Sequence, residues 1–204
     1  MILPTLKYEL DLWHQGYCAV AGLDEAGRGP LAGPLVAAAV ILPPSFRANT
    51  LPGQIRDSKT LSAKQRETAA QRIYDVASAV GVGRVENTEI DELGITKSGQ
   101  LAFQRALSKL VVKPDFYLVD AFMINDVDPN KQRAVIKGDQ KIFTVVAASI
   151  IAKTARYKIM GEYSKEFPGY GFEKHKGYCT HDHLVAIQKL GPCPIHRLSF
   201  RPLK

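Results

Sequence analysis

The sequence predicts an α/β fold, in which helices pack on a mixed β-sheet. Two apolar strand-like segments, residues 17–23 and 35–42, follow each other closely and form a predicted hairpin. Later apolar runs alternate with longer segments of helical periodicity, which favours parallel strands joined through helices. No internal repeat or low-complexity segment interrupts this order. A hairpin followed by alternating elements therefore indicates a sheet with both antiparallel and parallel pairs.

The predicted elements can be placed in order along the chain. The second strand stops at two prolines, and a loop rich in Pro, Gly and Asn runs to Arg56. Ser62 is a suitable N-cap for a helix that reaches about residue 80. Another helix begins near Asn87, and Pro114 marks the end of a later one. The remaining predictions are strands at residues 81–85, 115–120 and 134–136, and helices at residues 97–111, 145–166 and 181–190.

Length and composition describe an ordinary globular protein. With 204 residues, 46% hydrophobic and 23% charged, one domain covering residues 1–204 is sufficient. Three cysteines without a C-x-x-C motif argue against a disulfide framework or a zinc site. The N-terminus has no signal-peptide pattern, and the apolar runs are too short to span a membrane. We therefore expect a cytoplasmic protein without a membrane partner, and a monomer.

Charge is divided unevenly along the chain. Residues 1–130 carry 13 Lys/Arg and 15 Asp/Glu, a net charge of −2, whereas residues 131–204 carry 14 and 5, a net charge of +9. Cations suit the phosphate backbone of a nucleic acid, and acids suit metal ions. The split is compatible with a nuclease, although a basic solvated face without any partner is an equally simple interpretation.

Two neighbouring acids, Asp24 and Glu25, directly follow an apolar strand. Adjacent strand residues point to opposite faces, so the two carboxylates can meet only where the strand ends and the chain turns. The glycines of residues 27–29 supply such a turn. A buried acid needs a partner, which can be a metal ion, a lysine or a helix N-terminus. Taken alone, an Asp-Glu pair is more often structural than catalytic.

Two further acids follow later strands. Asp120 closes the strand at residues 115–120, and Asp139 follows the short strand at residues 134–136. Asp120 is equally compatible with a simple turn aspartate, and for Asp139 taken alone a simple turn aspartate is the better interpretation. Together with Asp24 and Glu25 they would suffice to hold two Mg²⁺ or Mn²⁺ ions about 4 Å apart, an arrangement that hydrolyses phosphodiesters. Spacing alone does not bring the four together.

The motifs as a set resemble the type 2 ribonucleases H, specifically bacterial ribonuclease HII. They occur in the family's order over nearly the whole chain, at residues 24–30 (Asp-Glu-Ala-Gly-Arg-Gly-Pro), 57–59 (Asp-Ser-Lys), 118–120 (Leu-Val-Asp), 137–139 (Lys-Gly-Asp), 147–153 (Ala-Ala-Ser-Ile-Ile-Ala-Lys), 175–178 (His-Lys-Gly-Tyr) and 196–200 (His-Arg-Leu-Ser-Phe). The resemblance implies a ribonuclease H-like fold, with a five-stranded mixed sheet and a helical C-terminal extension at about residues 168–204. It also implies cleavage of RNA/DNA hybrids and 5′ of single ribonucleotides in duplex DNA, leaving a 3′-hydroxyl and a 5′-phosphate.

The resemblance also assigns residues. Asp24, Glu25, Asp120 and Asp139 match the acids that bind two Mn²⁺ or Mg²⁺ ions and carry catalysis. The turn formed by Gly27, Arg28 and Gly29 matches the loop that contacts the 2′-hydroxyl, the group that distinguishes RNA from DNA. Tyr178 matches a tyrosine that packs on the sugar of the following deoxynucleotide, and phosphate contacts are implied for Asp57, Ser58, Lys59 and Lys153.

Some positions depart from the family pattern. Tyr157 stands where an acid usually follows the arginine, Ala121 where glycine is common, and Cys179 where proline is frequent. Arg197, in the closing motif, is either structural or binds the nucleic-acid backbone. His181 and His183 are two residues apart and do not share a helix face, which argues against a zinc site.

Three rival interpretations remain. The sister enzyme ribonuclease HIII usually has an additional N-terminal domain, for which the 23 residues before Asp24 leave no room. A non-catalytic nucleic-acid-binding module would be expected to lack one of the acids. A small-molecule phosphatase would not need the cationic last third. No clamp-binding segment is evident in the sequence.

Overall fold

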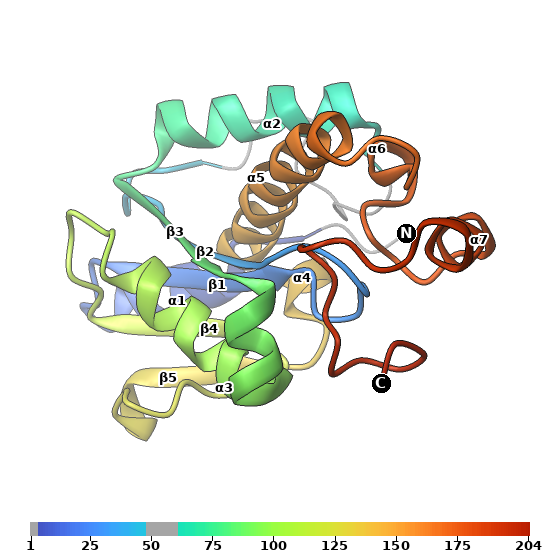
Figure 1. Cartoon of the computed structure of the whole chain (residues 1–204). Coiled ribbons are helices and arrows are strands. Elements are labelled where there is room, and N and C mark those ends of the chain that lie inside the picture. Colours follow the sequence, from blue (N-terminus) through green and yellow to red (C-terminus); the bar gives the residue numbers. More distant parts are fainter. Residues whose placement is uncertain (1–3, 48–60) are drawn as a thin grey trace.

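The computed structural model describes residues 4–47 and 61–204 and contains a five-stranded mixed sheet (Figure 1). The strand order is β3-β2-β1-β4-β5. β1 pairs antiparallel with β2, and β2 with β3, whereas β4 pairs parallel with both β1 and β5. The predicted sheet is therefore confirmed, with strands β1 (Val20–Ala26), β2 (Leu35–Ile41), β3 (Ala79–Val85), β4 (Phe116–Asp120) and β5 (Gln132–Val135).

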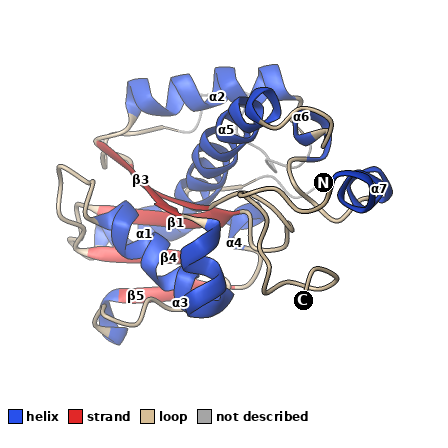
Figure 2. Cartoon of the chain, viewed as in Figure 1, coloured by secondary structure: helices blue, strands red, loops and turns tan. Residues whose placement is uncertain are grey.

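Helices cover both faces of this sheet (Figure 2). α3 packs on one face, and α5 packs on the other, with α2 lying over α5. The short α6 and the longer α7 follow α5, so the predicted helical C-terminal part is confirmed. The helices are α1 (Lys7–His14), α2 (Ala63–Val76), α3 (Asn87–Leu107), α4 (Gly138–Lys141), α5 (Phe143–Glu166), α6 (Phe172–His175) and α7 (His181–Leu190), with a 3₁₀ turn at Pro129–Lys131.

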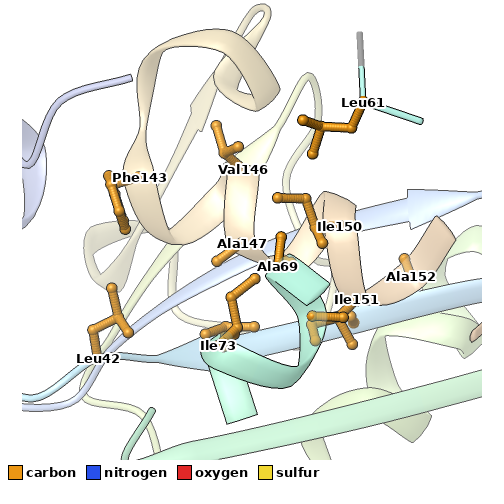
Figure 3. Packing of buried hydrophobic residues seen from close by; sticks show 14 of the residues in the cluster. Leu42, Leu61, Ala69, Ile73, Phe143, Val146, Ala147, Ile150, Ile151 and Ala152 are labelled. Carbon is orange, nitrogen blue, oxygen red and sulfur yellow. The ribbon is translucent and has the colours of Figure 1, made fainter. Parts of the chain in front are cut away.

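The interior strand β2 is buried on both faces, which explains its unbroken apolar sequence. Ala38 and Val40 belong to the core beneath α2 and α5, whereas Ala37, Ala39 and Ile41 belong to the core beneath α3. Figure 3 shows the first of these cores, to which both Ile73 of α2 and Ile151 of α5 belong. Burying each such aliphatic side chain stabilises the fold by about 1.5–3 kcal/mol.

Several predicted boundaries shift in the structure. Ser62 does cap α2, through a reciprocal pair of hydrogen bonds with Gln65, but the helix ends at Val76 rather than near residue 80. Ala79 and Val80 pair with β2 instead, because β3 matches the full length of that strand. The two helices predicted after residue 87 form α3, which is broken at Gly94 (φ 76°, ψ 157°) and ends at Leu107.

The N-terminal helix α1 is not predicted from the sequence. Its Glu9 is fully buried and accepts hydrogen bonds from the Thr144 backbone N–H (2.7 Å) and hydroxyl (2.9 Å). This places a carboxylate at the beginning of α5, where the helix dipole favours negative charge. Burial nevertheless raises the pKa of Glu9. Among the described residues, no helix is long and apolar enough to cross a membrane.

Candidate active site

All four predicted acids line one cavity of about 330 Å³ at the edge of the sheet. Asp24 and Glu25 come from β1, Asp120 ends β4, and Asp139 lies in α4. The same cavity is lined by residues 26–29, Lys153, Tyr157 and Tyr178. Segments far apart in the sequence therefore meet here. The predicted Asp57, Ser58 and Lys59 lie outside the described residues.

The reason why Asp24 and Glu25 can share this cavity differs from the prediction. β1 does not end before them but continues to Ala26, with Asp24 opposite Ala38 and Glu25 opposite Ala37 of β2. What ends is the pairing on the other side, because β4 accompanies β1 only as far as Leu23. Past that point the flank of β1 is open, and side chains from both of its faces reach the cavity.

Asp24 is oriented by helix α5. Its side chain is 5% exposed and interacts with Ser149 and Lys153, which lie one helical turn apart on α5. The Lys153 ammonium in turn donates to the Ser149 hydroxyl. Burial raises the pKa of Asp24 to about 6, although the Lys153 charge and the Ser149 hydrogen bond oppose the rise. Lys153 therefore faces the acids, in addition to any phosphate contact.

Glu25 faces the opposite side, toward the turn that follows the strand. Its carboxylate lies 3.6 Å from the Arg28 guanidinium, which packs over the Phe122 ring at 5.1 Å. Burial, and next the negative charge of Asp24, raises the pKa of Glu25 to about 8, despite the nearby Arg28 charge. The two neighbouring acids thus disfavour each other's ionisation, which is the condition that a bound cation relieves.

Asp120 and Asp139 are brought together by the tight connection after β5. The Gly138 backbone N–H donates to Asp120 Oδ1 at 2.7 Å, and the next residue, Asp139, is 5% exposed. Asp139 therefore lies in the short helix α4, and not in the plain turn that was the alternative interpretation of this residue. Ala121 adopts φ 63°, the left-handed region that favours glycine. The alanine that replaces the family's glycine thus carries backbone strain directly beside an acid.

The donor set fits hard divalent cations, since it consists of carboxylate oxygens. Across residues 4–47 and 61–204, no three acidic, histidine or cysteine side chains already surround one point as metal ligands. The four acids share a cavity, and in it Asp24 and Glu25 have raised pKa values.

The shifted pKa values predict how the metal-free protein responds to pH. Glu25 and Asp24 have folded-state pKa values of about 8 and 6, above the ordinary values of 4.5 and 3.8. Between about pH 4 and 8 the unfolded chain releases protons that the folded chain keeps, so stability falls as pH rises. We predict that Glu25→Gln raises the Tm in chelator at pH 8 by about 2–8 °C, or about 1–2 kcal/mol.

Differential scanning calorimetry of both proteins from pH 5 to 8, in chelator, checks this prediction. The wild-type Tm should fall more steeply with pH than that of Glu25→Gln. Glu92→Gln, at an exposed glutamate of α3, is the matched control and should follow the wild type. Parallel curves for wild type and Glu25→Gln would contradict the prediction, since they would show that folding does not raise the pKa of Glu25.

The turn at residues 27–29 is built around a glycine and two buried arginines. Gly27 has φ 102°, and a Cβ on it would lie 2.3 Å from Arg156 Nε and 2.7 Å from the Pro34 carbonyl. Only glycine fits there. Arg197, fully buried, donates to the carbonyls of Gly27 (2.7 Å), Arg28 (3.2 Å) and Gly33 (2.9 and 2.7 Å). Of the two roles left open for Arg197, the structure supports the structural one.

Tyr178 stands beside this turn. Its side chain is 43% exposed, and the nearest atom to a Cβ built on Gly29 is Tyr178 Cε1, at 4.0 Å. The Arg156 guanidinium lies 5.8 Å from the tyrosine ring centre and donates to the carbonyls of Ala32 and Pro34. Arg156 is therefore held by backbone carbonyls through Nε and Nη2, whereas its buried Nη1 has no hydrogen-bond partner among the described residues, Tyr157 being unable to supply the carboxylate expected there.

Tyr157 instead packs between cations. The Arg66 guanidinium and the Lys176 ammonium lie 5.0 and 5.7 Å from its ring centre. A second cavity of about 290 Å³ shares Tyr157 with the acid cavity and is also lined by Lys158. Burial lowers the pKa of Lys176, and the charges of Arg156 and Arg66 add to this. Positive charge is thus concentrated next to the acids.

Two contributors to the site, Ser149 and Phe122, were missed in the sequence. Ser149 could have been found from its spacing, since it precedes Lys153 by four residues on the predicted helix. Phe122 carries no such signal, because its contact with Arg28 depends on how β4 and the turn meet. For Arg197 the sequence left two roles open, because its carbonyl partners lie 164 or more residues earlier.

Comparisons with known proteins agree with this fold. The structure resembles the ribonuclease H2 of Pyrococcus horikoshii (TM-score 0.75, 29% identity, covering 90% of this chain and 94% of that one). It also resembles the ribonuclease HII in a PCNA complex from Archaeoglobus fulgidus (TM-score 0.72, 27% identity, covering 90% and 95%). Fold and site thus define a ribonuclease H, an endonuclease acting on RNA/DNA.

Sequence comparison gives the particular family. The family model described as Ribonuclease HII matches residues 21–202. Curated ribonucleases HII from Dehalococcoides mccartyi (45% identity, covering 100% of this chain and 95% of the relative) and Synechococcus sp. (46%, covering 100% and 91%) are similar over the full length. The chain belongs to the ribonuclease HII family. A ribonuclease HIII, the sister enzyme considered above as an alternative, resembles this chain in fold at 24% identity.

Proposed function

We propose that this ribonuclease H hydrolyses the RNA strand of RNA/DNA hybrids and also cuts 5′ of single ribonucleotides embedded in duplex DNA, leaving a 3′-hydroxyl and a 5′-phosphate. The observation that carries the proposal is the single cavity that joins Asp24, Glu25, Asp120 and Asp139 to the turn at residues 27–29. Chemistry and ribose recognition would then share one surface. The proposal includes one catalytic domain covering residues 1–204 in a monomer.

The four acids are proposed to hold two divalent ions, Mn²⁺ or Mg²⁺. Carboxylate oxygens are the preferred ligands of both ions. Burial first, and neighbouring negative charge second, raises the pKa values of Asp24 and Glu25, and a bound cation would stabilise the ionised form of both. When bound, such ions lower the pKa of water and stabilise negative charge on a phosphodiester. No histidine lines this cavity in the described part of the chain, so the acids themselves would position the ions and the scissile phosphate.

Recognition of the ribose is assigned to the backbone of Gly27, Arg28 and Gly29. The Arg28 side chain is turned toward Glu25 and Phe122, which leaves the backbone of the turn as its substrate-facing part. Tyr178, exposed beside Gly29, is proposed to pack on the following deoxyribose. A sugar without a 2′-hydroxyl offers an apolar surface to an aromatic ring. The turn at residues 27–29 and Tyr178 would therefore together select substrates with RNA on one side of the cut and DNA on the other.

Phosphate contacts are proposed for Lys153 and for the undescribed Asp57, Ser58 and Lys59. The cavity lined by Arg66, Lys158 and Lys176 continues the positive surface away from the acids. Contacts of this kind fix the position of a nucleic acid without reading its sequence. The basic last third of the chain thus has a proposed use in binding the backbone.

Substitution of Tyr178 tests the proposed recognition. We predict that Tyr178→Ala lowers kcat/KM on a duplex with one embedded ribonucleotide by about 10–100-fold, since it removes an aromatic contact worth about 1–3 kcal/mol. Uniform RNA/DNA hybrid, which has no junction to deoxyribose, should lose less. Tyr178→Phe should retain most activity on both substrates, because the ring carries the contact. An equal loss on both substrates would contradict the proposed role.

In the cell, such an activity would remove misincorporated ribonucleotides and RNA primers, and we propose a cytoplasmic location. The similar Archaeoglobus fulgidus protein was solved in a complex with PCNA.

The second candidate function is a non-catalytic nucleic-acid-binding module on the same fold. The retained acids favour the enzyme.

A further inference from the structure

Behind Tyr178 lies a cluster of three imidazoles that the proposed chemistry does not use. His183 of α7 is fully buried and His196 is 2% exposed. The rings of His175 and His183 stack at 4.4 Å between centres, and those of His183 and His196 lie 5.2 Å apart. Phe172 packs against all three. Buried imidazoles must have hydrogen-bond partners for their ring nitrogens. The contacts therefore assign each ring nitrogen as a donor or an acceptor.

The proton positions follow from one fixed donor. The Cys193 backbone N–H points at His196 Nδ1 (2.9 Å), so this nitrogen accepts, and its ring proton sits on Nε2. His196 Nε2 lies 3.1 Å from His183 Nε2, which must then accept. The His183 proton is consequently on Nδ1, where it faces the Tyr178 carbonyl at 2.9 Å. A directed chain of hydrogen bonds thus runs from Cys193 to Tyr178.

A second contact secures the residue before the tyrosine. His175 Nε2 lies 2.7 Å from the Tyr170 carbonyl and so donates to it, which leaves its Nδ1 to accept from the Gly177 N–H at 3.2 Å. The Gly177 carbonyl accepts from the Leu31 N–H at 2.8 Å. The loop bearing Tyr178 is thereby attached on one side to the imidazoles and on the other to the segment that follows the turn at residues 27–29.

The imidazole rings of His183 and His196 are both neutral in this arrangement. A second proton on either ring would place two N–H groups face to face at the His183–His196 contact, or one against the Cys193 N–H. In agreement, burial lowers the pKa of His183 to about 4 and also lowers that of His196. We call the chain of hydrogen bonds from Cys193 through His196 and His183 to Tyr178 the relay. It therefore keeps one proton arrangement at neutral pH.

We propose that His183 and His196 are positioning residues, which hold the Tyr178 backbone through this relay so that its ring meets the sugar on the DNA side of the cut. This inference rests on the proposed role of Tyr178. The relay would connect the segment Cys193–His196 to substrate discrimination without touching the substrate. Its loss should therefore impair cleavage at a single ribonucleotide more than cleavage of a uniform hybrid.

Two isosteric variants of His183 separate the two ends of the relay. In His183→Asn the amide nitrogen takes the place of Nδ1 and can still donate to the Tyr178 carbonyl. In His183→Gln the amide takes the place of Nε2, so the contact with His196 is kept and the donor to Tyr178 is lost. We expect His183→Gln to lower kcat/KM on the single-ribonucleotide duplex about tenfold, with a smaller loss on the hybrid. His183→Asn, which keeps the donor to Tyr178 but loses the contact with His196, should lose less than His183→Gln on the single-ribonucleotide duplex and stay within about threefold of wild type on the hybrid.

Combination with Tyr178→Ala gives the decisive comparison. If His183 acts through Tyr178, the double variant Tyr178→Ala with His183→Gln should be no worse than Tyr178→Ala alone. Multiplied losses, or equal losses on both substrates, would overturn the proposal. If Tyr178→Ala itself changes neither substrate, the proposed role of Tyr178 fails and the functional part of the relay fails with it. An effect of Tyr178→Ala without one of His183→Gln overturns the relay alone.

A measurement on the wild-type protein does not depend on the folding of any variant. Long-range ¹H–¹⁵N correlation spectra at neutral pH report the protonated nitrogen of each imidazole. The relay predicts the Nδ1–H form for His183 and the Nε2–H form for His196, both neutral. The Nε2–H form or a charged ring at His183 would overturn the proposal.

Discussion

Asp120→Asn should lower the single-turnover cleavage rate by at least about 10³-fold, while leaving the protein folded. Removing one anionic ligand takes away several kcal/mol of charge stabilisation at the phosphate. The substitution is mild for the fold, because an asparagine oxygen can still accept the hydrogen bond that the Gly138 N–H donates to Asp120 at 2.7 Å. The effect is therefore expected on the chemistry, not on folding.

The measurement combines rapid-quench kinetics with calorimetry. The Tm of Asp120→Asn should stay within about 2 °C of wild type, and substrate binding should remain. Asp126→Asn, at an exposed aspartate in the connection after β4, is the matched control and should cleave at the wild-type rate. A loss of less than about tenfold in Asp120→Asn would exclude Asp120 from metal binding.

Arg197→Met should have the largest effect on stability. The guanidinium is fully buried and makes four hydrogen bonds to the carbonyls of Gly27, Arg28 and Gly33. Methionine fills similar space but leaves these carbonyls without their donor, and each unsatisfied buried group costs about 1–3 kcal/mol. We expect a loss of about 3–5 kcal/mol, and hence a fall in Tm of about 6–20 °C.

The same substitution should also affect activity, because the turn that Arg197 holds is the proposed ribose reader. Arg197→Lys, which can reach fewer of these carbonyls, should lie between Arg197→Met and wild type in Tm. Arg201→Met, at an exposed arginine four residues later, provides the control and should melt like wild type. A Tm for Arg197→Met within about 2 °C of wild type would contradict the structural role.

The strands and long helices could be predicted because their patterns are local. β2 is apolar throughout since both of its faces are buried, and the N-cap of α2 is visible as Ser62 followed by Gln65. α1 was missed because it is short and its key residue, Glu9, is a charged side chain that is buried only through contact with Thr144. Such a contact spans 135 positions, and no local pattern indicates it.

In the candidate site, too, some features could be predicted from the sequence and others could not. Its residues were predicted because the resemblance supplied them by position, and the structure brings Asp24, Glu25, Asp120 and Asp139 to one cavity. The geometry was predicted wrongly at β1. The sequence suggested that the strand ends before Asp24, whereas the strand continues and only its pairing with β4 ends. The pairing length of a neighbouring strand cannot be read from the residues of the strand itself.

The most direct test of the central claim is the position of the cut. A DNA duplex carrying one embedded ribonucleotide, labelled at either end, is incubated with the protein and Mn²⁺ or Mg²⁺, and the products are sized at single-nucleotide resolution. We predict one cut on the 5′ side of the ribonucleotide, leaving a 3′-hydroxyl and a 5′-phosphate, and its loss in chelator. Uncut duplex under both metals, with binding retained, would contradict the enzyme proposed here and support a binding module instead.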